Sequence, residues 1–409
     1  MLTHWIWLAH RPGVRDWMKI RLLAHFSDPE DIFFADREAY SLIDGLTEDA
    51  LAGLEDKDLS SAQEILDRCE QENLKILTLQ DERYPERLKN IYDPPLVLYY
   101  KGTMPRLDDM PVIGVVGTRS ASPYGIQTAR QMGTQIAACG GAVVSGLAKG
   151  IDSAAMSGAL HAGGTVIGVL GCGADIVYPA SNKALFKDVE RYGCILSEFV
   201  PGMPPAKWTF PKRNRIISGL SNGVLVVEAP EKSGALITAR LATEQGRDVF
   251  AVPGNVNQSG CLGSNRLMQD GAMVAMTGWD VMREYESQYP KVHRAEVPAS
   301  GLPKTEDRPL EKVAQKPVIP GKKSPLKKNL EKKTIDNGQP KPYSDVKTSL
   351  PKLTEDEQTI ISCLQNGQRL VDEVIAESNM KPGKILGLLT MMELKGILKR
   401  LPGKRITLK

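Results

Sequence analysis

The central part of the chain, residues 111–286, alternates short apolar runs with stretches in which apolar residues recur at helical spacing. The apolar runs, each of which we expect to be a strand, are Val112–Val116, Ala142–Ser145, Thr165–Leu170, Cys194–Ser197, Gly223–Val227, Asp248–Val252 and Ala272–Met276. The helical stretches between them begin near Pro123, Asp152, Asn182, Arg215, Ala235 and Ser264. Apolar strands separated by helices are typical of a parallel sheet covered on both faces. The pattern therefore predicts an α/β fold with a doubly wound, mostly parallel, Rossmann-like sheet.

The residues before this sheet are acidic and have a helical pattern. Apolar residues recur at helix spacing within Ile20–Phe26, and a second amphipathic stretch begins at Leu59. We therefore expect a small helical domain at the start of the chain, and no binding or catalytic chemistry is visible in it.

The last part of the chain, residues 351–409, has the pattern of a winged helix. Thr354–Glu357 is a capping box ahead of an apolar helix, a second short helix follows Asp372, and a third begins at Pro382. Two strand-like runs joined by a Pro-Gly turn fill residues 397–408. Such a module either contacts DNA or binds another protein.

A basic, proline-rich segment separates the sheet from this module. Residues 291–350 contain eight prolines and a Lys-rich stretch but almost no aromatic residues. Such a composition buries too little apolar surface to offset the entropy lost on ordering. We expect a disordered linker, which is either a solvated tether or an additional contact for nucleic acid.

Composition and charge exclude several classes of protein. No run approaches the roughly 20 apolar residues that cross a bilayer, and the first residues lack the pattern of a signal peptide. The six cysteines lie far apart, without the spacing of a zinc site or of a disulfide scaffold. We expect a cytoplasmic protein that has no membrane association, no metal and no cofactor.

The net charge of +3 is unevenly distributed. Residues 1–110 carry 13 Lys and Arg against 22 Asp and Glu, whereas residues 291–350 carry 14 against 7. The basic excess in the second half is where we expect a polyanionic partner to bind.

Loops at the carboxyl ends of the predicted strands carry anion-binding chemistry. Ligands of open α/β sheets bind at this edge, where glycines, hydroxyls and helix N-termini suit phosphates. After the first, second and fifth strands the candidates are Gly117, Thr118, Arg119, Ser120, Lys149, Ser233 and Gly234. The alternative is that these loops are ordinary turns with exposed or capping side chains.

The segment Lys207–Arg215, after the fourth strand, combines four cations and two aromatic residues in a stretch that has no acidic residue. Cations contact phosphates, and aromatic rings stack on unpaired bases at about 1–3 kcal/mol per base. The candidates here are Lys207, Phe210, Lys212, Arg213, Asn214 and Arg215. The alternative is that Trp208 and Phe210 are core residues and the lysines are merely solvated.

No catalytic constellation is visible. His161, the one histidine of the α/β region, falls in a helical run, and no nucleophile elbow, H-E-x-x-H motif or kinase motif set is present. Glu198 and Glu228 end two strands and are either paired carboxylates or groups that cap helices or form hydrogen bonds in the loops. We expect a binding protein with no catalytic residues.

Taken together, these motifs resemble those of the DNA-processing protein A (DprA/Smf) family of bacteria. The matching stretches are Val116-Gly-Thr-Arg-Ser, Ser145-Gly-Leu-Ala-Lys-Gly-Ile-Asp, Gly171-Cys-Gly-Ala-Asp-Ile-Val-Tyr-Pro, Phe210-Pro-Lys-Arg-Asn-Arg-Ile-Ile-Ser-Gly-Leu, Ser233-Gly-Ala-Leu-Ile-Thr-Ala-Arg and Asp248-Val-Phe-Ala-Val-Pro-Gly-Asn. One departure is Cys261-Leu-Gly-Ser-Asn-Arg, where the family usually has a Gly-Thr-Asn-type run.

The resemblance implies a protein that binds single-stranded DNA, protects it during natural transformation and helps to load the RecA recombinase. It also implies a homodimer formed through the Rossmann-like core. The family's DNA-contacting positions correspond here to Gly117, Thr118, Arg119, Ser120, Lys207, Phe210, Arg213 and Asn214. The remaining candidates, added on their chemistry and loop position, are Lys149, Lys212, Arg215, Ser233 and Gly234.

We expect four domains. They are a helical, SAM-like domain over residues 1–105, a Rossmann-like DNA-binding core over 106–288, the linker over 289–350 and a winged helix over 351–409.

Two other functions compete with single-strand binding. One is a nucleotide phosphoribohydrolase, because the LOG enzymes share a related core, but their Pro-Gly-Gly-x-Gly-Thr loop is followed by a catalytic glutamate, and here no acid follows Ser233 until Glu244. The other makes the winged helix a reader of duplex DNA and the core a scaffold.

Overall fold

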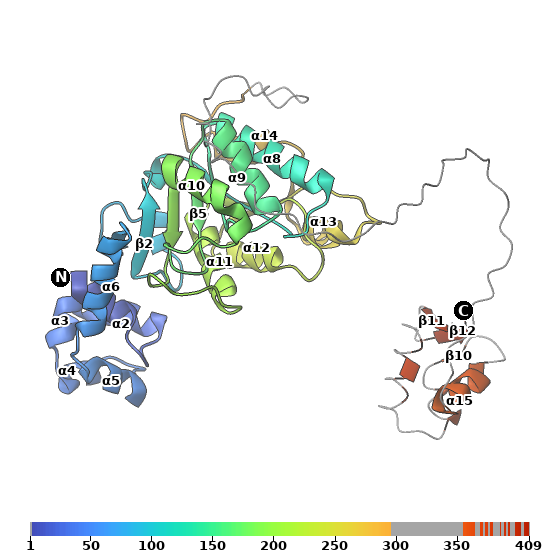
Figure 1. Ribbon diagram of the computed structural model, residues 1–409, viewed down its shortest axis with the longest axis horizontal. Helices are drawn as coiled ribbons and strands as arrows, with labels where there is room; N and C mark the ends of the chain where they lie inside the picture. Colours follow the sequence, from blue (N-terminus) through green and yellow to red (C-terminus); the bar gives the residue numbers. More distant parts are fainter. Residues whose placement is uncertain are drawn as a thin grey trace, which may run out of the picture. The chain divides into compact units, whose positions relative to one another are not determined.

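The computed structural model describes residues 2–295 and, in the C-terminal part, residues 355–364, 369–370, 373–374, 377–378, 385, 388–389, 392, 397–401 and 405–408. The chain divides into two compact units, Met1–Pro309 and Leu310–Lys409 (Figure 1). Most of the predicted linker lies outside the described residues, and so do Thr354 of the predicted capping box and Pro382.

The first unit is built on a nine-stranded sheet. Seven of its strands pair in parallel, and in order across the sheet they are β6 (Cys194–Ser197), β5 (Val166–Val169), β4 (Ala142–Ser145), β3 (Val112–Val116), β7 (Gly223–Val226), β8 (Asp248–Ala251) and β9 (Met273–Val274). Each lies at one of the apolar runs of the sequence. The prediction of a mostly parallel, doubly wound sheet is therefore confirmed.

Helices cover both faces of the sheet (Figure 1). On one face lie α8 (Pro123–Ala138), α9 (Ile151–His161), α10 (Lys183–Tyr192) and α14 (Gly278–Met282), and on the other α7 (Glu86–Lys89), α11 (Thr209–Leu220) and α12 (Gly234–Glu244). Within β3, Ile113 and Val115 pack with α8 and α9, whereas Val112 and Val116 pack with α11 and α12. Successive strand residues point to opposite faces, so a strand covered on both sides must be continuously apolar.

The strand order places a switch point between β3 and β7. The chain proceeds from β3 through β4 and β5 to β6 on one side, and from β7 through β8 to β9 on the other. The loops after β3 and β7 therefore lead away in opposite directions at the carboxyl edge. Such a point forms the crevice in which open α/β sheets bind ligands.

Helix α11 begins earlier than the sequence pattern predicts. Its first residue is Thr209, not a residue near Arg215. Pro211 fits the first turn of a helix because that turn needs no amide hydrogen from it. The basic, aromatic segment after β6 is therefore itself the start of a helix.

Two further strands extend the sheet beyond β6. They are β1 (Lys75–Thr78) and β2 (Val97–Gly102), and β2 pairs antiparallel with β6. Tyr99 and Tyr100 of β2 are both buried. The sheet thus begins at residue 75, well before the predicted domain boundary at residue 105.

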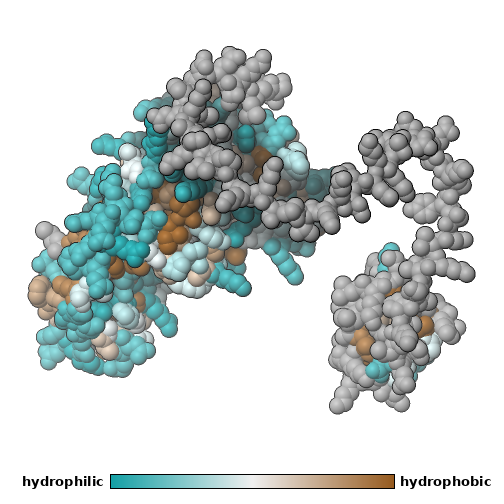
Figure 2. All heavy atoms as spheres, viewed as in Figure 1, coloured by the Kyte–Doolittle hydropathy of each residue, from teal (hydrophilic) through white to brown (hydrophobic). Residues whose placement is uncertain are grey.

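Six helices occupy residues 2–71, where the sequence predicts helices. They are α1 (Leu2–Ala9), α2 (Asp16–Phe26), α3 (Pro29–Phe34), α4 (Arg37–Ser41), α5 (Glu48–Glu55) and α6 (Ser60–Gln71). Their buried side chains, such as Ile6 and Leu22, belong to the same apolar cluster as Val115 of β3. Hydrophilic residues cover most of their outer surface, whereas hydrophobic residues show mainly in the middle of the core (Figure 2). No helix among the described residues is long and apolar enough to cross a membrane.

In the second unit, the described residues form one helix and three strands of the predicted winged helix. α15 (Glu355–Leu364) precedes a three-stranded sheet in the order β10 (Arg369–Leu370), β12 (Arg405–Leu408), β11 (Leu398–Leu401). β11 and β12 pair antiparallel, which confirms the predicted hairpin. Ile360, Ile385 and Leu389 are buried in its core.

Candidate nucleic-acid interface

A cleft of about 330 Å³ opens at the switch point of the sheet. Its walls are the loops after β3 and β7 and the first turns of α11 and α12. Eight predicted site residues line it, and these are Gly117, Thr118, Arg119, Phe210, Arg213, Asn214, Ser233 and Gly234. The cleft thus brings together residues that lie more than 100 positions apart in the chain.

The loop after β3 is held in place by Glu228 at the end of β7. The Thr118 amide donates to the Glu228 carbonyl oxygen at 2.8 Å, and the Ser122 hydroxyl donates to the Glu228 carboxylate at 2.6 Å. The Ser122 amide donates to the same carboxylate at 3.1 Å. Gly117 is required here because a Cβ atom would stand 2.5 Å from Ile151. Glu228 is therefore hydrogen-bonded to the loop after β3 and not paired with Glu198, which follows β6, four strands away in the sheet.

Replacing Glu228 with alanine should destabilise the fold. Glu228 is buried, and without its carboxylate the partly buried amide and hydroxyl of Ser122 would lose their acceptor, so the free energy of unfolding should fall by about 1–3 kcal/mol. Urea denaturation followed by circular dichroism measures this loss. Glu231→Ala, an exposed acid on the same loop, is the control and should change stability little. Equal stability of the two variants would contradict the role of Glu228.

An aromatic ring with a cation over it forms one wall of the cleft. The Arg119 guanidinium carbon lies 4.9 Å from the centre of the Phe210 ring. The centres of the Tyr178 and Phe210 rings are 5.6 Å apart. Gly171 leaves room for this ring, since a Cβ atom there would be 2.9 Å from Phe210. We call these three side chains, Arg119, Phe210 and Tyr178, the aromatic platform. A partly exposed ring beside a free guanidinium suits a base and its phosphate.

Arg213 lies at the floor of the cleft and is buried. Its guanidinium donates to the Val169 carbonyl oxygen, and its Nε atom donates to the Asn214 side-chain oxygen at 3.2 Å. Burial lowers the pKa of Arg213 to about 10, although the nearby Asp152 carboxylate acts in the opposite direction. The Arg213 guanidinium therefore stays charged at neutral pH. The charge of Arg119 lowers the pKa of Arg213 further. An anion bound between the two guanidinium groups would relieve this repulsion.

Two helix N-termini face the cleft. Ser233 caps α12, and its hydroxyl accepts a hydrogen bond from the Ala235 amide at 3.2 Å. A Cβ atom on Gly234 would meet nothing within 4 Å, so this first residue of α12 borders open space. The start of α11 is fixed by Thr209, whose hydroxyl donates to the Gly171 carbonyl oxygen at 2.5 Å. Free amides and the helix dipole favour anions at both ends.

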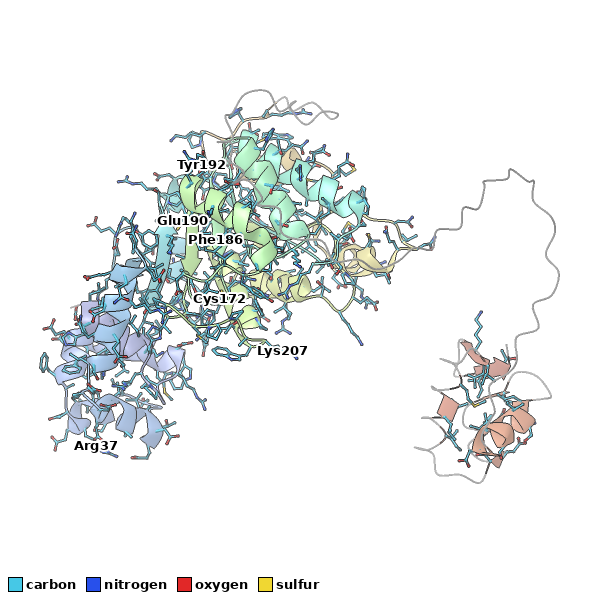
Figure 3. The ribbon with its side chains drawn as sticks, viewed as in Figure 1. Arg37, Cys172, Phe186, Glu190, Tyr192 and Lys207 are labelled. Carbon is cyan, nitrogen blue, oxygen red and sulfur yellow. The ribbon has the colours of Figure 1, made fainter. Side chains whose placement is uncertain are left out.

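Five predicted residues do not line the cleft. Ser120, Lys149 and Lys207 are exposed outside it, and Figure 3 shows Lys207 at the edge of the core. Lys212 and Arg215 lie on the opposite side of α11 from the cleft. Lys212 Nζ is 3.1 Å from an Asp16 carboxylate oxygen, and the buried Arg215 guanidinium contacts the carboxylates of Glu198 and Asp93.

Two residues in the cleft region were missed by the sequence reasoning. Lys232 lines the cleft from the loop after β7. The Tyr178 ring lies beside the Phe210 ring. Tyr178 belongs to one of the stretches that resemble the family, but it was not among the predicted site residues. The available signal for Tyr178 was an aromatic residue in a loop at the end of a predicted strand.

Comparison with known families covers most of the chain. The family model described as DNA recombination-mediator protein A matches residues 75–286. A second model, the DprA winged helix domain, matches residues 345–404. The first match begins at β1, and the second confirms the predicted winged helix.

Individual relatives agree with these matches. Protein Smf of Synechocystis is 31% identical over 98% of this chain and 98% of its own length. The DNA processing protein DprA of Bacillus subtilis is 42% identical over 54% of this chain and 74% of its own length. The X-ray structure of DNA processing protein A from Streptococcus pneumoniae aligns with a TM-score of 0.61 at 33% identity, covering 69% of this chain and 98% of that one.

Proposed function

The chain belongs to the DNA recombination-mediator protein A family, and we propose that its central cleft binds single-stranded DNA without altering it chemically. The observation that carries the proposal is the aromatic platform beside two helix N-termini and the buried Arg213. This arrangement offers a stacking surface and several hydrogen-bond donors for anions in and beside one cleft.

Each component of the cleft has a counterpart in a single strand. A phosphate fits between Arg119, Arg213 and the N-terminus of α12, where positive charge converges. An unpaired base stacks on Phe210 or Tyr178, at about 1–3 kcal/mol per base. Every base has an aromatic face, so binding should depend little on sequence. A duplex keeps its bases stacked on each other and cannot use the platform.

Hydrolysis is the weaker alternative for this cleft. Asp152 is the one carboxyl group among the residues that line it, and that group is buried and accepts a hydrogen bond from the Gly146 amide at 3.1 Å. The Glu228 carboxylate accepts hydrogen bonds from the amide and the hydroxyl of Ser122. Neither group is free to act on a bound nucleotide, which supports a binding role.

The wider role follows from the family resemblance. We propose that the protein acts in the cytoplasm as a homodimer formed through the Rossmann-like core. It would protect single-stranded DNA and help to load a RecA-type recombinase in natural transformation or recombination. Support comes from the matches across both the core and the winged helix.

Fluorescence anisotropy with oligo(dT) and with a duplex of equal length at physiological salt tests the proposal. We expect tight binding of the single strand and weak binding of the duplex, because only the single strand offers unstacked bases. Equal affinity for both would contradict it. Release of free base from nucleoside monophosphates by the protein would favour the phosphoribohydrolase instead.

Deleting residues 351–409 tests whether the core binds on its own. Single-strand affinity should largely survive, because the residues of the cleft all lie between 116 and 238. The same anisotropy titration measures the change. Loss of binding on deletion would assign the DNA site to the winged helix and leave the core as a scaffold.

A further inference from the structure

The first turns of α11 have two faces with different partners. A helix turns about 100° per residue, so Phe210, Arg213 and Asn214 share one face, and Lys212 and Arg215 lie on the opposite one. The first face lines the cleft. On the second face, Arg215 contacts Asp93 and Glu198, and Lys212 contacts Asp16 of the N-terminal helices, which links those helices to α11.

The link is an ion pair to the start of α2. Lys212 Nζ lies 3.1 Å from Asp16 Oδ2, and Lys19 Nζ lies 3.1 Å from Asp16 Oδ1. Burial alone would raise the pKa of Asp16, but the charges of Lys19 and Lys212 lower it to about 2. Asp16 is therefore a carboxylate at neutral pH and is shared by both lysines.

The pair belongs to a larger set of charges that balance each other. We call this set the ionic cluster, and its members are Asp16, Asp93, Glu198, Lys19, Lys212 and Arg215. Three negative and three positive groups are thus present. The side chains of Arg215, Lys19 and Glu198 are only 5, 8 and 13% exposed. Removing one member leaves an opposite charge without compensation in a partly buried place.

The ionic cluster connects α2 to α11. A cavity of about 170 Å³ lies between them, and Asp16, Lys19, Trp208 and Lys212 are among its lining residues. A buried oxygen of Glu198 has no hydrogen-bond partner there. At this point the two helices are therefore joined by an ion pair at the edge of a cavity. A change in one charge should shift α11 more easily than it would in a packed seam.

We propose that the N-terminal helices position α11 through the Asp16–Lys212 pair, so that Lys212 is a positioning residue for the cleft and not a contact of DNA. The inference rests on the proposed single-strand binding by that cleft. A small rotation of α11 displaces Phe210 and Arg213 together, because both belong to its first turns. The helical N-terminal segment is then part of the binding apparatus without touching the strand.

Charge variants of the full chain separate positioning from direct contact. Asp16→Asn and Lys212→Met should each weaken oligo(dT) binding about three- to tenfold. The double variant should be no weaker than the singles, since it restores the charge balance of the ionic cluster. The slope of log affinity against log salt concentration should equal that of the unmodified protein. Lys212→Arg should keep the affinity, because it keeps the pair.

A direct contact would give the opposite pattern. Lys212→Met alone would then weaken binding and reduce the salt slope by about 0.7, which is the share of one phosphate contact on a single strand. Asp16→Asn would leave binding unchanged or strengthen it, because it frees Lys212. Either result overturns the inference. Should Asp16→Asn fail to fold, Lys212→Met and Lys212→Arg still decide between the two through the salt slope.

Two further variants make the result specific. Arg37 forms an exposed pair with Glu48 at 2.6 Å in the same N-terminal helices, far from the core in Figure 3. Arg37→Ala should leave the affinity unchanged, and a loss equal to that of Asp16→Asn would point to general damage of these helices. Arg119→Ala reports on the cleft itself. Unchanged oligo(dT) affinity of Arg119→Ala would refute the proposed function. If Arg119→Ala loses affinity and Asp16→Asn does not, only the positioning role is refuted.

Discussion

Replacing Arg119 with alanine is expected to weaken oligo(dT) binding about ten- to a hundredfold. The change removes a charge that faces the cleft and the cation over the Phe210 ring. A hydrogen bond to a charged group contributes about 1.5–3 kcal/mol, and each 1.4 kcal/mol is a factor of ten in affinity. The salt slope should become shallower by about 0.7, because one phosphate contact is lost. Anisotropy titrations at several potassium chloride concentrations measure both quantities.

Two variants place this effect in the cleft. Arg119→Lys keeps the charge but not the planar fork, so its affinity should lie between those of the alanine variant and the unmodified protein. Lys207→Ala removes an exposed charge outside the cleft and should cost less than Arg119→Ala. Losses of equal size at the two positions would mean that general surface charge, and not the cleft, holds the strand.

The seven parallel strands could be predicted because burial on both faces leaves a strong local signal. Every residue of β3 is buried, so the run Val112–Val116 contains no polar position. The strands β1 and β2 left a weaker signal. Lys75–Thr78 is short and partly exposed, and its place depends on pairing with β2, which in turn pairs with β6 about 95 residues later. Such pairing is not visible in a local pattern.

The candidate site could be predicted as a set of loops but not residue by residue. The sequence places four cations in Lys207–Arg215, yet it does not say which side of a helix each one occupies. Arg215 forms ion pairs with Asp93 and Glu198, and Lys212 forms one with Asp16. These carboxylates lie far away in the chain or on another element. A positive residue in a basic segment is thus a candidate contact only until its carboxylate partners are known.

The two glutamates at strand ends illustrate the same limit. Glu198 and Glu228 follow β6 and β7 in equivalent positions of the sequence pattern. In the structure the first neutralises Arg215 behind α11, and the second fixes the loop that presents Arg119. Both shape the cleft from outside its lining. Their roles depend on which helix or loop lies beside each strand, and this follows from strand order.

Gly234→Glu is expected to weaken single-strand binding by at least about a hundredfold. Gly234 is the first residue of α12, and a Cβ atom there would meet nothing within 4 Å, so the new side chain fits. Its carboxylate would occupy the place where the helix N-terminus and Arg213 favour a phosphate. Like charges brought together at an interface cost several kcal/mol. Anisotropy with oligo(dT) measures the loss.

Affinity should fall in this variant without a loss of stability, which separates lost binding from lost folding. A glutamate in the first turn suits the helix dipole, and any residue other than proline is a better helix former than glycine, so the unfolding temperature should rise or stay constant. Gly234→Gln has the same size without the charge and should retain much more of the affinity than Gly234→Glu. If the two variants bind equally weakly, bulk and not charge blocks the cleft. If both bind as the unmodified protein does, the strand does not pass the N-terminus of α12, and the proposed path of the phosphates is wrong.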